Sequence, residues 1–186
     1  MTTESVLNIF NEKANAWLED LEKVDPEKMN VRPAEKSWSF GEVYDHVMKV
    51  TRTFQIPYLK QSTTDAAVKV QGKNKYGVKA FDEGDRRHVS MRMEEFPKEL
   101  ITLFTPVKRD KEDLLKDFKG FIKEVNDLKE ILSKSTDEHK QFHPMFGDIN
   151  TNEWFRLIEM HMHQHTNQMV KLKKFLETSE FSSESK

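Results

Sequence analysis

The chain has 186 residues, and 30 basic residues against 32 acidic ones leave a net charge of −2. This length suits a single domain with its own core, and the balanced charge argues against nucleic-acid binding, which usually requires a basic field. No apolar run approaches the ~18 residues of a transmembrane helix, and the N-terminal residues lack the pattern of a secretory signal. We therefore expect a cytoplasmic protein that binds neither nucleic acid nor membrane.

Cysteine is absent from the chain. Its absence removes disulfides, thiolate metal sites and a cysteine nucleophile together. A metal ion would have to be held by His, Asp or Glu, and thiol chemistry would need a thiol from outside. Glycine and proline, six residues each, are scarce enough to indicate a mostly helical chain.

A first helix is predicted from about Glu4 to Lys23, because apolar residues recur there at steps of three and four. Its apolar face includes Trp17 and no titratable side chain, so we assign this helix a scaffold role. Pro26 and the polar residues around it are expected to end the helix.

The start of the second helix gives the clearest local signal. Ser39 and Glu42 stand at the two positions of a capping box, and Trp38 and Val43 stand at those of a hydrophobic staple. This helix is predicted to continue to about residue 60. His46 faces its inner side, near the edge of the apolar stripe. Glu42 shares that side, but the cap accounts for it, so it is the weaker candidate for a metal ligand.

The region from 61 to 106 is too long for an ordinary connection in a compact domain. A long crossover is what a bundle needs when two consecutive helices run parallel. Within it we expect a short hairpin near Val68–Val78 and a turn of helix near Glu94–Phe104. The basic stretch 71–77 is either a solvated loop or a site for the anionic part of a ligand.

A third helix is predicted next, because Pro106 suits a first turn and apolar residues at helical spacing continue to about Ser133. The link after it contains His139 and His143. We interpret both as loop histidines, since Pro144 follows directly and disfavours a helix there.

The fourth helix is predicted to begin after Asn150, which forms a second capping pattern with Glu153 and has Ile149 and Trp154 as its staple. His161 and His165 lie in the middle of its apolar stripe, one turn apart. The opposite side of the helix is polar and carries Arg156, Glu159, His163 and Lys174. A buried pair of this kind either shares a metal ion or consists of core histidines with local hydrogen bonds.

Four amphipathic helices with one long crossover predict a four-helix bundle, in which Trp17 and Trp154 are buried. In this bundle, His46 can meet His161 and His165 if the second and fourth helices place the three residues at the same depth. Three neutral imidazoles would leave a coordination position open, so that a divalent ion could activate a bound water or thiol, or polarise a carbonyl.

Other histidine-based metal sites fit the sequence less well. A zinc protease helix needs glutamate directly after its first histidine, where this chain has Met162. Ferritin-like di-iron bundles use paired Glu-x-x-His motifs, which do not occur here. A hemerythrin-like di-iron site would need further histidine and carboxylate ligands, for which we find no candidates at core positions.

Several separated motifs together resemble the DinB-like (YfiT-like) metal-binding four-helix superfamily. They are Trp38–Glu42 leading to His46, His143–Gly147, Glu153–Trp154, and His161-x-x-x-His165 followed by Gln168. The resemblance covers roughly Val6–Leu176. It implies an all-α bundle with up-down-down-up topology and the long crossover between helices 2 and 3. We expect one domain over residues 1–177, and a disordered tail over 178–186 because of its polar composition.

The resemblance also implies a divalent metal ion held by His46, His161 and His165. Zinc, nickel and iron all suit imidazole ligands. The implied activity is that of a thiol-dependent S-transferase similar to the bacillithiol transferases, in which a small thiol attacks an electrophilic substrate as its thiolate. No residue besides the ligands is assigned a catalytic role. The alternative is a non-enzymatic metal-binding or stress-associated protein, and a homodimer is kept as a possible assembly.

Overall fold

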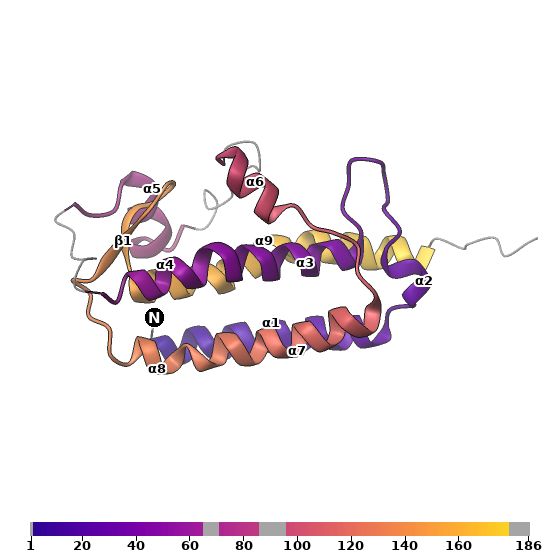
Figure 1. Cartoon of the computed structure of the whole chain (residues 1–186), viewed down its shortest axis with the longest axis horizontal. Coiled ribbons are helices and arrows are strands. Elements are labelled where there is room, and N and C mark those ends of the chain that lie inside the picture. Colours follow the sequence, from indigo (N-terminus) through magenta and orange to yellow (C-terminus); the bar gives the residue numbers. More distant parts are fainter. Residues whose placement is uncertain (1, 65–70, 86–95, 179–186) are drawn as a thin grey trace, which may run out of the picture.

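The computed structural model describes residues 2–64, 71–85 and 96–178. Four long helical segments of these residues form a bundle (Figure 1). They are α1 (Thr3–Lys23); α3 (Phe40–Val50) continued by η1 (Thr51–Gln55) and α4 (Ile56–Gln61); α7 (Lys111–Asp127) continued by α8 (Lys129–Leu132); and α9 (Thr151–Thr178). The expected fold class, an all-α four-helix bundle, is confirmed.

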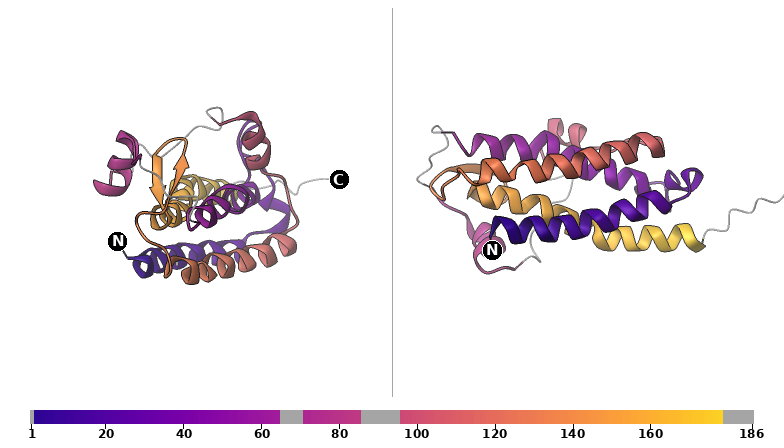
Figure 2. Two further views of the ribbon diagram at one scale, coloured as in Figure 1. Left: turned by 60° about the vertical axis from the view of Figure 1, so that its left-hand side comes forward. Right: turned by 90° about the horizontal axis from the view of Figure 1, so that it is seen from below.

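The bundle has the expected up-down-down-up topology. In Figure 1, α1 and α9 run from left to right, whereas α3 and α7 run from right to left. Helix α1 packs against α7 and α9, and α3 packs against the same two helices. The crossover between α4 and α7 contains α5 (Lys75–Gly77), η3 (Val78–Asp82) and α6 (Lys98–Phe104). Figures 1 and 2 place its helices outside the bundle, on the side of α3 and α9.

Both predicted helix caps are present. The Ser39 hydroxyl accepts the backbone N–H of Glu42 at 3.3 Å, and the Glu42 carboxylate accepts that of Ser39 at 2.9 Å. At the start of α9, the Asn150 side chain accepts the N–H of Glu153 at 2.9 Å, and the Glu153 carboxylate accepts that of Asn150 at 2.8 Å. These bonds satisfy N–H groups that a helix start leaves unpaired.

The core is rich in aromatic side chains. Both tryptophans predicted to be buried are buried, Trp17 at 5% exposure and Trp154 at 0%. The hydroxyl of Tyr44 in α3 donates to the Trp17 carbonyl at 2.7 Å, which ties α3 to α1 across the bundle. Phe118 of α7 meets the ring of Tyr44 edge-on with centroids 5.0 Å apart, and it has no exposed surface.

A two-stranded antiparallel hairpin forms where we predicted a loop. Its strands are β1 (Lys140–His143) and β2 (Gly147–Asn150). The hairpin predicted near Val68–Val78 is wrong for its described part, 71–78, in which a single bridge from Lys73 to Gly147 is followed by α5. Residues 65–70 lie outside the described ranges. Gly147 has φ +78°, and a Cβ there would lie 2.8 Å from the backbone nitrogen of Asn74, so this contact requires glycine.

The third helix begins at Lys111 and not at Pro106. The chain before it is extended, because the carboxylate of Asp45 accepts the backbone N–H of Val107 at 2.8 Å. The helical turn expected near Glu94–Phe104 is present as α6, and residues 94 and 95 lie outside the described part.

Three further differences concern helix ends and faces. Pro26 does not only end the first helix: it opens the short helix α2 (Pro26–Met29), in which proline suits the first turn. Thr178, assigned to the tail, is the last residue of α9, and 179–186 lie outside the described residues. Glu159, predicted on the polar side of the fourth helix, is 2% exposed and pairs with Lys13 at 2.5 Å, because α9 is packed against α1 as well as α3 and α4.

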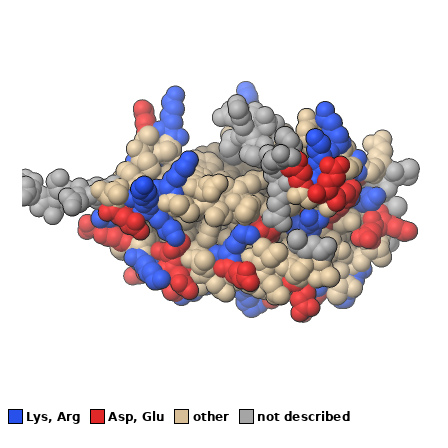
Figure 3. Space-filling model, turned by 180° about the vertical axis from the view of Figure 1, so that it is seen from behind, with Lys and Arg blue, Asp and Glu red and all other residues tan. Residues whose placement is uncertain are grey.

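The surface agrees with the balanced composition. Lysine and arginine side chains are interspersed with aspartate and glutamate on the face shown in Figure 3. Among the described residues, no helix is both long enough and apolar enough to cross a membrane.

The packing of α7 on α3 predicts a large cost for truncating Phe118. We expect Phe118→Ala to lower the free energy of unfolding by about 3–5 kcal/mol, because the bundle can close only part of the resulting cavity. Phe142→Ala is the matched control, since Phe142 is 54% exposed and should cost at most about 0.5 kcal/mol. Urea unfolding measures both values, and equal losses in the two variants would contradict this packing.

Candidate metal centre

Three histidines converge between α3 and α9. The Nε2 atom of His161 lies 3.2 Å from Nε2 of His46 and 3.2 Å from Nε2 of His165. One candidate ligand atom from each ring lies within 4.8 Å of the other two. His46 is 4% exposed, and the other two rings are half-buried. The structure thus brings together the three residues named from the sequence, whereas His163 is exposed.

The hydrogen bonds of two rings fix where their protons lie. Nδ1 of His46 is 2.8 Å from the carbonyl oxygen of Phe104, and Nδ1 of His165 is 2.8 Å from the side-chain oxygen of Gln168. A carbonyl oxygen can only accept, so each Nδ1 carries the ring proton and donates it. The Nε2 atoms of His46 and His165 therefore present bare lone pairs toward His161.

The third ring cannot satisfy both of these lone pairs. A neutral His161 has one proton, which Nε2 can donate to only one neighbour. Its Nδ1 is buried and has no hydrogen-bond partner among the described residues. A tetrahedral zinc ion with Zn–N bonds of ~2.0–2.1 Å would place its nitrogen ligands about 3.3 Å apart, close to the two 3.2 Å separations. The donor set therefore fits a divalent cation.

Burial keeps these rings neutral. It lowers the pKa of His46 to about 4, and the nearby His165 adds to the shift. Burial is also the main cause that lowers the pKa of His161 well below its usual value. It lowers the pKa of His165 as well, against the opposing hydrogen bond with Gln168. Neutral imidazole is the form that binds metal ions.

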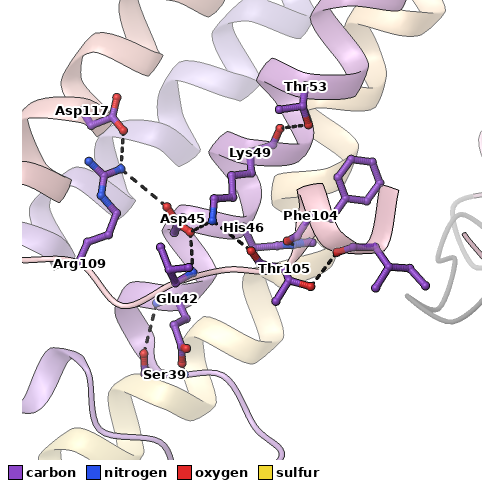
Figure 4. A network of polar contacts seen from close by, with 12 residues as sticks. Ser39, Glu42, Asp45, His46, Lys49, Thr53, Phe104, Thr105, Arg109 and Asp117 are labelled. Atoms are coloured by element: carbon purple, nitrogen blue, oxygen red, sulfur yellow. Dashed lines mark hydrogen bonds and ion pairs between the residues drawn. The ribbon is translucent and has the colours of Figure 1, made fainter. Parts of the chain in front are cut away.

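A polar network outside the three rings holds the carbonyl that orients His46 (Figure 4). Lys49 donates to the carbonyl oxygen of Thr105 at 3.1 Å and pairs with Asp45 at 2.8 Å. The Asp45 carboxylate also accepts the N–H of Val107. The chain just after α6 is thereby fixed against α3, and with it the Phe104 carbonyl. Sequence reasoning did not identify this carbonyl, because it comes from the crossover and its residue type is not polar.

The three histidines form part of the wall of a cavity of about 320 Å³. The Trp38 ring also lines it, with its centroid 4.4 Å from that of His46. The described lining residues include no Asp, Glu, Lys or Arg. Apart from these four residues they are Val50, Phe54, Gln55, Phe96, Phe104, His143, Met145, Phe146, Leu157, Met160, Gln164 and Gln168. The described part of the wall is thus mostly apolar and carries no formal charge.

The remaining candidate residues have other partners. The Glu42 carboxylate binds the backbone of Ser39 and the guanidinium of Arg32, so it does not join the histidines. In the basic stretch, Lys73 pairs with Glu153 at 2.5 Å and with Asp82 at 2.9 Å. The first pair joins the crossover to α9, and the second lies within the crossover. The charge of Lys73 is thus balanced within the protein.

The comparisons with known proteins identify the family. A family model described as the DinB superfamily matches residues 9–169. The chain is 26% identical over 173 residues to the uncharacterized protein YuaE of Bacillus subtilis (strain 168), covering 92% of this chain and 99% of that protein. It is also similar in fold, with a TM-score of 0.51 and 18% identity, to the crystal structure of TT2238, a four-helix bundle protein, covering 91% of this chain and 99% of the other. The chain belongs to the DinB superfamily.

The buried neutral histidines predict that the metal-free protein loses stability in mild acid. The folded pKa is about 4 for His46 and, because of burial, about 3 for His143, both below the ~6.5 of an unfolded histidine. The unfolded chain therefore takes up protons first as the pH falls. The free energy of unfolding should be highest above pH ~6.5 and fall below it, by up to ~1.4 kcal/mol per pH unit for each histidine.

Urea unfolding of the metal-free protein between pH 7 and pH 5 tests this expectation. His143→Phe removes one of these titrating groups, so the free energy of unfolding should change less steeply with pH, by up to ~1.4 kcal/mol per pH unit. A free energy of unfolding that stays constant over this range would contradict the burial of neutral histidines.

Proposed function

We propose that the chain binds one divalent metal ion through His46, His161 and His165. The observation that carries this proposal is the convergence of three imidazole Nε2 atoms, two of which must present lone pairs because their Nδ1 atoms donate elsewhere. Membership of a superfamily whose members generally bind metal ions supports it further. Zinc, nickel and iron suit three imidazole ligands.

We further propose that the site serves a thiol-dependent S-transferase. Three protein ligands leave room for a ligand from outside, and the trio faces a cavity with a mostly apolar described wall. A bound divalent ion would lower the pKa of a small thiol, so that it reacts as thiolate near neutral pH. The chain has no cysteine, so the thiol would come from solution, and the electrophile is a second small molecule. His46, which is 4% exposed, forms the more buried side of the site.

Substitutions of single histidines test the ligand set. His46→Ala, His161→Ala and His165→Ala should each reduce bound metal from about one ion per chain to a small fraction, because each removes a nitrogen donor. His163→Ala is the matched control on the same helix. It should keep its metal, since its ring is exposed. Elemental analysis after dialysis gives the stoichiometry, and circular dichroism verifies the fold of each variant.

Two results would overturn this ligand set. One is a loss of metal in His163→Ala together with retention in His165→Ala. The other is a wild-type protein that is isolated without metal and takes up neither zinc nor nickel.

Turnover with an added thiol tests the proposed reaction. The metal-loaded protein should accelerate conjugation of bacillithiol, or of another small cellular thiol, to a haloarene. The metal-free protein and His161→Ala should not, because no ion is then present to activate the thiol. The measurement is the rate of release of halide. Equal rates for loaded and metal-free protein with every thiol tried would leave a metal-binding protein without transferase activity.

A further inference from the structure

The cavity wall contains a fourth histidine that does not belong to the trio. His143 ends strand β1, is 6% exposed and lines the same cavity as the three candidate ligands. The sequence indicated only a loop histidine here. The turn after β1 uses one ring nitrogen of His143, but neither the fold nor the proposed metal centre gives a role to the other.

The local backbone determines which nitrogen of His143 carries the proton. The backbone N–H of Met145 donates to Nδ1 of His143 at 3.1 Å, so Nδ1 must be the unprotonated nitrogen. Burial lowers the pKa of this ring to about 3, which keeps it neutral near pH 7. Its one proton therefore lies on Nε2.

The Nε2–H group is a donor without an acceptor in the described part of the protein. The other contacts of the ring are aromatic: the centroids of Phe146, Trp154 and Phe54 lie at 4.7, 5.0 and 5.5 Å. These rings hold the imidazole in place. The Nε2 atom is not among the fully buried unpaired polar atoms of the described residues, so it keeps some accessible surface. A fixed donor of this kind in a cavity wall is suited to an acceptor that a ligand brings.

The rest of the wall limits the chemistry of that ligand. The described residues around the cavity have aromatic, aliphatic, thioether, imidazole and amide side chains and no formal charge. Among the described lining residues, a charged molecule would find no side chain of opposite formal charge to replace its hydration. The volume of about 320 Å³ is in the lower part of the range for small-molecule sites.

We propose that His143 is a ligand-binding residue whose Nε2–H donates to an oxygen of an uncharged, mostly apolar molecule in this cavity. Ketone, ester, epoxide and nitro oxygens are acceptors of this kind. The assignment rests on the proposed function in one respect, because there the molecule is the electrophilic substrate of the thiol. His143 keeps its proton and orients the substrate oxygen, so it determines which electrophiles bind.

Two matched probes test this assignment. 2-Acetylnaphthalene and 2-ethylnaphthalene are uncharged and similar in shape, and only the first has a carbonyl oxygen. Their dissociation constants are measured with zinc-loaded and metal-free full-length protein, for the wild type, His143→Phe and His139→Phe. His139 is the control, because it lies in the same link but does not line the cavity.

The expected result is a change in selectivity. The preference for the ketone over the ethyl compound should fall roughly three- to tenfold in His143→Phe, as for the loss of one neutral hydrogen bond. Binding of 2-ethylnaphthalene should persist, and His139→Phe should behave as the wild type. The infrared stretch of the bound ketone should lie at lower frequency in the wild type than in His143→Phe, with and without zinc.

A second variant repeats the test in case the first one perturbs the fold. Asparagine at 143 can accept the N–H two residues on, so His143→Asn should keep the turn at Met145 while its shorter side chain withdraws from the cavity. It should lose the ketone preference as His143→Phe does. An unchanged preference in both variants, or no binding of either probe to the wild type, would overturn the assignment.

The same samples separate this inference from the proposed function. A ketone preference that disappears on removal of zinc and persists in His143→Phe would mean that the oxygen binds the metal, which also overturns the role of His143. Metal uptake without any effect of His143 contradicts the inference alone. An effect of His143 on ketone binding in a protein that takes up no metal contradicts the proposed function and supports the inference.

Discussion

The site depends on one constraint, which is that a neutral imidazole in an apolar core needs a partner for each of its two nitrogens. His46 and His165 meet half of this requirement within the chain, through Phe104 and Gln168. Both then present a lone pair to the same point, where His161 brings a third nitrogen. Without a cation, the three rings have too few protons to satisfy each other. A divalent ion would satisfy all three Nε2 atoms, which is why we regard the trio as a binding site and not as core packing.

The crossover completes a site that the four long helices begin. The bundle supplies the histidine side chains, but the carbonyl that orients His46 belongs to the end of α6, outside the bundle. The hairpin between α8 and α9 adds His143 and Phe146 to the cavity wall. The cavity therefore lies between the bundle and the elements that cover it. The long connection therefore has two roles: it allows two consecutive helices to run parallel, and it provides part of the site.

The sequence predicted those parts of the structure that depend on neighbouring residues. The capping box of Ser39 and Glu42 spans four residues, and helical periodicity alone places His161 and His165 on one face and His163 on the other. Bundle geometry allowed His46 to meet this pair if α3 and α9 place them at the same depth, and the resemblance to the DinB-like superfamily implied that they do. The caps and the helix faces are short-range features, so the single sequence was enough to find them, whereas the choice of His46 as the third member also relied on the resemblance.

Interactions between distant segments could not be predicted in this way. The bond from Val107 to Asp45 keeps the chain extended where Pro106 alone suggested a helix. The burial of Glu159 depends on Lys13 of another helix. The hairpin pairs two strands of four residues each, too short for a clear alternating pattern. The π-helical turn η1 was also missed. It ends at Gln55, two residues before Pro57, which has no backbone N–H to donate.

The central claim is that one divalent ion binds to Nε2 of His46, His161 and His165. Anomalous diffraction at the zinc edge, from crystals grown with one equivalent of zinc per chain, tests it most directly. The predicted result is a single strong peak between α3 and α9, about 2.0–2.1 Å from each of the three Nε2 atoms. A peak bound elsewhere, with the three rings hydrogen-bonded to one another or to water, would contradict the claim.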